Sequence, residues 1–325
     1  MGRYIARRSL WVVALLFIIS IVTFCIFYIL PADPAALSAG KSSSTEEIEL
    51  IRVKLGLDKP LYAQYGDFVK GIFVGRTIGG NECGAPCMGY SFKNEQPVFE
   101  TILDRLPVTF SIAAGAAVLW LLMGVTVGII SALKKGTFID RAAMTGALAG
   151  VSLPLIFIGY VILLVLVYKL KIFPQPRYND FTDNPLKWAQ GLILPWCALA
   201  FVNSALYARL VRANMLETMA EDYVRTARAK GLPERTVIRR HGLRAALTPI
   251  VTVFGLDMGQ LLGGAVLTEQ VFSIQGMGKL ALTSIFNTDL PVIVGVTVFA
   301  AFFVVAANLV VDILYAVVDP RVRYS

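Results

Sequence analysis

Few residues of this sequence have the types and spacing that catalysis requires. His241 is the only histidine among 325 residues, and no partners for a catalytic triad or a metal cluster are evident around it. Gly40-Lys41-Ser42 matches the end of a phosphate-binding loop, but Ala35 stands where that pattern needs its first glycine. The sequence therefore predicts that the chain is not an enzyme and has no nucleotide site, metal or cofactor of its own.

One acidic residue interrupts an otherwise apolar stretch. Asp257 lies in GLDMGQLLGGAVL, and Gln260 follows three residues later on the same helix face. An ionisable group at membrane depth is costly and usually faces a cavity or a partner. Two interpretations stay open: Asp257 and Gln260 line a translocation path, or Asp257 makes a buried structural hydrogen bond. Gly255, Gly259 and Gly263 predict a closely approaching second helix, at a pore or subunit interface.

The elements that must position these residues are membrane spans. The chain is 56% hydrophobic and 16% charged, whereas soluble domains average about 25% charged. Each apolar run can cross about 30 Å of hydrocarbon as a helix. The predicted fold is an all-α membrane protein with six transmembrane helices at 10–30, 106–133, 142–168, 188–208, 249–268 and 292–318. The first run exceeds the roughly 7–15 residues of a signal-peptide core, so it is expected to be retained.

The distribution of basic residues predicts the orientation. If the N-terminus is cytoplasmic, the inner segments hold 17 Lys or Arg in 64 residues and the outer segments hold 13 in 117. This bias follows the positive-inside rule, so both termini and the segment 209–248 are expected in the cytoplasm. The net charge is +8, but the basic residues flank apolar spans and do not cover a soluble face. This distribution argues against binding nucleic acid.

The outer segment 31–105 is expected to contain short helices. Helical spacing of apolar residues occurs at 46–57 and 61–69, whereas 75–90 is glycine-rich and reads as irregular. Cys83 and Cys87 lie in this segment, where an oxidising compartment permits a disulfide. Two free thiols are the alternative, and a zinc site would lack further ligands. We predict a Cys83–Cys87 disulfide that pins the loop.

The segment 209–248 is the least membrane-like part of the chain. Glu221 and Arg225 have the spacing of a helical ion pair, and Gly231 and Pro233 predict a helix stop followed by a new start. The expected structure is a helix–turn–helix at the membrane surface. Composition also allows a basic connector that binds anionic lipid.

The run YVRTARAKGLPERTVIRRHGLRAALTPIV resembles the cytoplasmic EAA loop of permease subunits in ATP-binding-cassette importers, most closely the B permeases of the dipeptide/oligopeptide branch. That motif is Glu-Ala-Ala, three residues, then Gly. Here Arg225-Thr226-Ala227 occupies the first places and Gly231 the last, so the first two depart from the general pattern. RRSLWVVALLFIISIVTFCIFYILPADPA, GGAVLTEQVFSIQGMGKLALTSIFNTDLPVIVGV and NLVVDILYAVVDPRVR extend the resemblance over nearly the whole chain, whereas GGNECGAPCMGY looks like an insertion.

The resemblance implies a type I importer permease in the bacterial cytoplasmic (inner) membrane. The domains would be an N-terminal helix 1–30, an extracytoplasmic segment 31–105, and a core 106–325 that contains the coupling loop 209–248. A short helix would dock onto an ATPase and transmit its movement to the spans. The implied coupling residues are Arg225, Thr226, Ala227, Arg228, Ala229, Lys230, Gly231 and Leu232.

The resemblance also implies partners. These are a second permease subunit, two ATPase subunits that bind ATP and Mg²⁺, an extracytoplasmic peptide-binding protein, and the surrounding lipid. The same architecture could import a nickel chelate or glutathione. An ATP-independent secondary transporter is a further alternative, but it would favour paired membrane charges or inverted repeats, which the sequence does not display.

Overall fold

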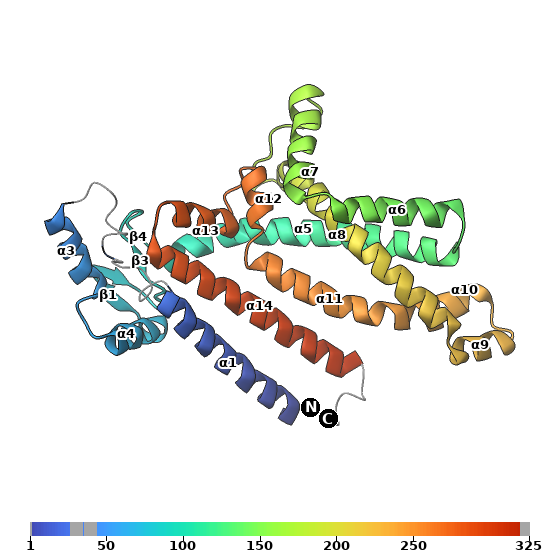
Figure 1. The fold of residues 1–325 in the computed structure, drawn as a ribbon, viewed down its shortest axis with the longest axis horizontal. Helices are drawn as coiled ribbons and strands as arrows, with labels where there is room; N and C mark the ends of the chain where they lie inside the picture. The colour runs from blue at the N-terminus through green and yellow to red at the C-terminus, as the bar shows by residue number, and fades with distance from the viewer. Residues whose placement is uncertain (1, 27–34, 36–43, 319–325) are drawn as a thin grey trace. The chain divides into compact units, whose positions relative to one another are not determined.

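The computed structural model describes residues 2–26, 35 and 44–318, with residues 2–6, 55, 312 and 314–318 described by backbone alone. Helices dominate the described residues (Figure 1). Five helical runs are long and apolar enough to cross a membrane. They are α1 (Gly2–Phe24), α5 (Val98–Leu133), α8 (Pro185–Ala220), the run Glu234–Leu262, and α14 (Leu290–Val318).

The third predicted span is broken. It consists of α6 (Phe138–Ser152) and α7 (Leu155–Ile162), which continues as a π-helix to Lys169, and the two parts are bent by 100°. Leu153 is extended, with φ −90° and ψ 127°. The following Pro154 explains this break, because a residue before proline is disfavoured in the α conformation. The described residues thus contain five such helices, or six spans if this bent pair counts as one. The fifth span, predicted at 249–268, ends earlier, at Leu262, and the predicted end of the first span at 27–30 lies outside the described residues.

The chain divides into two compact units, and the first contains most of the predicted outer segment. Helix α3 (Thr45–Leu55) starts with a capping box between Ser44 and Glu47 and ends at Gly56, which has φ +69°. Helix α4 (Leu61–Val74) follows. Both short helices are therefore confirmed, and α4 is longer than the sequence indicated.

The glycine-rich segment is more ordered than expected. Strands β1 (Arg76–Ile78) and β2 (Asn81–Cys83) form one antiparallel hairpin, and β3 (Tyr90–Ser91) and β4 (Gln96–Pro97) form another. The prediction of an irregular segment at 75–90 was wrong at β1, at β2 and at Tyr90. Gly79 and Gly80 both have positive φ, which allows the two-residue turn between β1 and β2.

The first unit also has a core built from helices far apart in the sequence. The start of α5, the helix α13 (Met277–Phe286) and the first half of α14 supply its buried side chains. These are Val98, Ile102, Met277, Val292, Val296 and Phe299. Gly295 permits close packing here, because a Cβ on it would lie 2.4 Å from a methyl of Val98. The core thereby joins the outer segment to the last span.

The second unit depends on close contact between α5 and α8. A Cβ on Gly124 would lie 2.6 Å from Cβ of Tyr207, and a Cβ on Gly128 would lie 2.7 Å from the carbonyl oxygen of Ala208. Small residues four apart let helix backbones approach in this way. The indole of Trp196 donates to the backbone oxygen of Ser111 at 3.0 Å, so a third contact joins the same two helices.

The glycine repeat of α11 (Arg244–Leu262) also packs closely, as the sequence predicted. In the second unit, a Cβ on Gly255 would lie 1.9 Å from a methyl of Val311, and in the first unit a Cβ on Gly259 would lie 2.5 Å from Cβ of Ala307. Val311 and Ala307 both belong to α14 of the same chain. This glycine face is therefore occupied within the chain and is not left open to another subunit.

Candidate coupling loop and intramembrane polar site

The predicted coupling segment is a compact helical hairpin. Helix α8 ends at Ala220, Glu221 is extended, and α9 (Asp222–Ala229) follows. Gly231 has φ +74° and reverses the chain, after which α10 (Glu234–Thr236) starts and continues through a π-helix (Val237–Leu243) into α11. In Figure 1, α9 and α10 lie together beyond the end of α8. The predicted helix–turn–helix is present, with an additional break at Glu221.

This hairpin has its own small core. Val224 and Ala227 of α9 are buried with Val237, and Met219 of α8 packs against them. Seven of the eight predicted coupling residues at 225–232 are exposed, and Ala227 is the buried one. Its small side chain therefore serves the packing of the hairpin itself. The sequence suggested that Ala227 belongs to an outward docking surface, but its side chain is buried in the core of the hairpin.

Ion pairs fix the two arms of the hairpin. The guanidinium of Arg228 donates to both carboxylate oxygens of Glu234, at 3.1 and 2.7 Å, across the Gly231 turn. This bond raises the pKa of Arg228 above its ordinary value. Arg225 lies 3.5 Å from Asp222. The sequence suggested a pair with Glu221, but that residue is the extended cap of α9 and lies outside the helix.

A second polar cluster lies within the same unit. Asp140 at the start of α6 is buried, and Arg212 of α8 donates to its two oxygens at 2.7 and 2.8 Å. Ser131 of α5 donates to the same carboxylate, and the backbone N–H of Gly136 donates at 2.9 Å. A buried charge needs a partner and satisfied lone pairs, and here both are provided. Three helices therefore meet at one carboxylate.

Asp257 has a partner that sequence reasoning missed. The hydroxyl of Tyr207 on α8 donates to a carboxylate oxygen of Asp257 on α11 at 2.6 Å. Tyr207 is 1% exposed, and Trp120 of α5 packs 6.1 Å from its ring. Asp257 itself is half-buried, and Gln260 is exposed. Asp257 therefore makes the interhelical hydrogen bond that one interpretation expected. Its carboxylate is also half-exposed, which is compatible with lining a translocation path.

Neither of these side-chain pairs could be predicted from a local sequence pattern, because the partners are far apart in the chain. Arg212 and Tyr207 are separated by 72 and 50 residues from the carboxylates that they contact. One signal was available for the first pair, because both Asp140 and Arg212 stand at the edge of an apolar run. Among the described residues, no group of three His, Cys, Asp or Glu is placed to hold a metal ion.

Cys83 and Cys87 form a disulfide, with their Cα atoms 5.5 Å apart. Both are buried beside Ile78 and Tyr90. The segment that follows the disulfide also contacts a later part of the first unit. Ser91 donates to the buried carboxylate of Asp289, whose pKa is raised by burial.

Comparison with known proteins gives a consistent result. Residues 124–324 match the family described as binding-protein-dependent transport system inner membrane component, and residues 1–113 match the N-terminal region of such membrane components. A relative in Brucella abortus (strain 2308), whose name describes a peptide transport system permease protein, is 39% identical over the full length of both chains. The glutathione transport system permease protein GsiC of Escherichia coli O6:H1 (strain CFT073) is 36% identical, again over both full lengths.

A solved structure shares the fold. The MetNI methionine ABC transporter, in inward-facing conformations, aligns with a TM-score of 0.54 at 16% identity, covering 68% of this chain and 97% of that chain.

Replacement of Arg212 by Gln is expected to lower the melting temperature of the protein clearly, because it removes the two hydrogen bonds that Arg212 donates to the Asp140 carboxylate. Thermal unfolding of the purified chain in detergent measures this. Arg209→Gln is the matched control, since Arg209 is an exposed arginine on the same helix. The double variant Asp140→Asn/Arg212→Gln should be more stable than Arg212→Gln alone. Equal stability of the Arg212 and Arg209 variants would contradict the assignment.

Proposed function

Because this chain belongs to the family of binding-protein-dependent transport system inner membrane components, we propose that it forms part of the route by which peptides enter the cell. It is a multi-pass permease subunit of an ATP-binding-cassette importer in the inner membrane. The observation that carries the peptide assignment is the full-length match to a relative named for peptide transport. Glutathione is the second candidate substrate, supported by the match to GsiC.

The coupling hairpin is the proposed contact with an ATPase. Its exposed residues at 225, 226 and 228–232 form the outer surface, while Val224, Ala227 and Val237 hold the arms together from inside. A unit that is packed and ion-paired internally can move as one body. Helix α8 has 36 residues and runs directly to this hairpin, so it extends about 54 Å at 1.5 Å per residue. Displacement at the hairpin would thereby reach the spans.

The chain is proposed to work with other subunits. A second permease would complete the translocation path, two ATPases would bind ATP and Mg²⁺, and an extracytoplasmic binding protein would deliver the peptide. This division of labour is supported by the family, whose members are inner membrane components that depend on a binding protein.

Asp257 and Gln260 are the proposed polar lining of the path. Asp257 is held by Tyr207, so its carboxylate has a fixed position, and Gln260 is exposed one turn later on α11. A fixed, half-exposed carboxylate at membrane depth suits contact with a polar solute.

The test of the proposed function is co-purification. The tagged chain, expressed with its neighbouring genes, should recover a second permease and ATPases. Their ATP hydrolysis should rise when a peptide-loaded binding protein is added. If the binding protein stimulates ATP hydrolysis only when it carries glutathione, the substrate would be glutathione and not a peptide. A chain that purifies alone and moves solute down an ion gradient would refute the importer proposal.

Replacement of Ala229 by Trp should block coupling. Ala229 is exposed at the end of α9, so a bulky side chain there would obstruct a docked ATPase without disturbing the hairpin's interior. We expect at least a tenfold loss of uptake. Weakening the binding of the ATPase by about 1.4 kcal/mol already lowers its affinity tenfold. Uptake into membrane vesicles and recovery of the ATPases are the measurements.

The matched control is Ala245→Trp, because Ala245 is also an exposed helical alanine in the segment 209–248. It should retain uptake and ATPase binding. Normal uptake by the Ala229→Trp variant would place the ATPase contact elsewhere.

Replacement of Asp257 by Asn should lower uptake several-fold while the chain still assembles with its partners. The variant keeps the shape and removes the charge. Tyr207→Phe is the comparison variant, since it removes the hydrogen-bond donor and leaves the Asp257 carboxylate in place. Uptake and thermal stability should be measured for both. Unchanged uptake with reduced stability in both variants would assign the pair a structural role only.

A further inference from the structure

Helix α4 lies in the segment that was predicted to stand outside the membrane, yet it carries an exposed apolar strip. Tyr62, Val69 and Phe73 recur at the spacing of one helix face. Tyr62 is 80% exposed and Phe73 is 77% exposed. Large apolar side chains that gather on one exposed face mark a surface that meets a partner or a membrane. Neither the proposed peptide path nor the coupling hairpin uses this strip.

A neighbouring face of α4 is held against the first span. Tyr65 packs against two rings of α1, with centroids 6.1 Å from that of Phe17 and 5.4 Å from that of Phe24. Its hydroxyl lies 2.7 Å from the hydroxyl of Ser20. Ser20 already donates to the carbonyl oxygen of Phe17 at 2.9 Å, so Tyr65 is the donor in this bond. All four residues belong to the first unit, so the seat of α4 on α1 is defined within one compact body.

This seat lies at membrane depth. Arg8 is the last charged residue before the apolar run of α1, so it marks one edge of the hydrocarbon. Ser20 follows 12 residues later on the same helix, a rise of about 18 Å at 1.5 Å per residue. Tilting of α1 would only reduce that height. Because the hydrocarbon core is about 30 Å thick, Tyr65 meets α1 within the lipid layer and not beyond its end.

The lipid-facing surface of α1 therefore continues onto α4. Leu10, Val13 and Ile18 are exposed apolar side chains of α1, and such side chains on a spanning helix face lipid. Along α4, Tyr62 precedes Tyr65 by three residues, so it stands on the adjoining face. The exposed strip of α4 thus begins beside the contact with the span.

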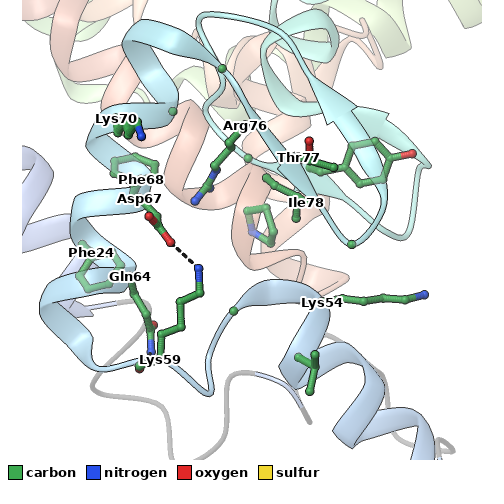
Figure 2. Close-up of a pocket in the computed structure, with 18 residues that line it drawn as sticks. Phe24, Lys54, Lys59, Gln64, Asp67, Phe68, Lys70, Arg76, Thr77 and Ile78 are labelled. Carbon is green, nitrogen blue, oxygen red and sulfur yellow. Dashed lines mark hydrogen bonds and ion pairs between the residues drawn. The ribbon is translucent and has the colours of Figure 1, made fainter.

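The charged side chains of α4 suit a position at the edge of the lipid. Asp67 follows Tyr65 by two residues and so stands on the opposite side of the helix. It accepts a hydrogen bond from Lys59 at 2.7 Å, and Figure 2 shows the two side chains directed toward each other. Lys70 is exposed, and a lysine stem can lie along an apolar surface while its ammonium reaches water or head groups. Helices with one apolar face and one charged face lie in the membrane interface.

We propose that α4 is an interfacial helix whose strip of Tyr62, Val69 and Phe73 lies in the leaflet that surrounds the C-terminal half of α1. The partner of this surface is lipid, and Lys70 would reach the phosphates of its head groups. The N–H of Cys87 donates to the carbonyl oxygen of Gly71 on α4 at 3.0 Å. An anchored α4 would therefore also hold the disulfide loop at a fixed height relative to that leaflet.

The first experiment measures lipid contact at single positions of the full chain in nanodiscs of phosphatidylglycerol and phosphatidylcholine. The free cysteines Cys25 and Cys197 are replaced by serine, and Phe73→Cys is labelled with the fluorophore NBD. Phospholipids with brominated acyl chains quench a fluorophore that touches them. Quenching at 73 should be several-fold stronger than at Asn94→Cys, because Asn94 is exposed in the turn between β3 and β4. Val13→Cys is the positive control on the exposed face of α1.

The second measurement needs no substitution. Hydroxyl radicals generated in water oxidise the aromatic side chains that water reaches, and mass spectrometry locates the products. In nanodiscs, Tyr62 should be oxidised several-fold more slowly than Tyr223 of α9. Within the chain itself Tyr62 is the more exposed of the two, at 80% against 46%, so slower oxidation would have to come from lipid.

Strong quenching at 73 together with slow oxidation of Tyr62 supports the proposal. NBD at 73 that behaves like NBD at 94 would overturn it, as would oxidation of Tyr62 as fast as that of Tyr223. Both measurements are then repeated with the second permease and the binding protein present. Quenching that disappears when either is added would assign the strip to a protein interface and overturn the lipid assignment. These readouts involve no peptide or ATP, so their failure is distinguishable from failure of the importer proposal.

Discussion

The carboxylate of Asp140 joins three helices of the second unit. It accepts hydrogen bonds from Arg212 on α8, from Ser131 on α5 and from the turn at Gly136. A buried ion pair is not a simple gain in stability, because both charges lose water. It does require one geometry, and that geometry holds α5 and α6 against α8, the helix that leads to the coupling hairpin. The movement proposed for the hairpin would therefore reach α5 and α6 through α8.

Close backbone contact between helices also determines how the spans pack together. Gly124 and Gly128 let α8 approach α5, and Gly255 and Gly259 let α14 approach α11. In a membrane the hydrophobic effect offers little preference for helix contact over lipid contact, so small residues and interhelical hydrogen bonds determine which helices associate. The Tyr207–Asp257 bond adds such a contact between α8 and α11. Polar residues in the spans thus have structural partners before any role in transport is considered.

The predicted outer segment follows different rules, because its elements are short and have a small apolar core. A capping box, two short hairpins and the Cys83–Cys87 disulfide stabilise it. Small structures with limited cores often rely on such covalent links. The disulfide loop also contacts helix α4, because the N–H of Cys87 donates to the carbonyl oxygen of Gly71 at 3.0 Å.

The sequence by itself determined the membrane class, the approximate positions of the spans, the short helices α3 and α4, and the stop at Gly231, because these depend on local runs of apolar residues and on turn residues. It also singled out Asp257 and Cys83 with Cys87. Only the tertiary structure decided that Ala227 faces inward, that Arg225 lies beside Asp222 and that the third span bends by 100° at Pro154. It also decided that Tyr207 and Arg212 hold the carboxylates of Asp257 and Asp140. These facts depend on which faces of distant helices meet, and a single sequence carries no local signal for partners 50 or 72 residues apart.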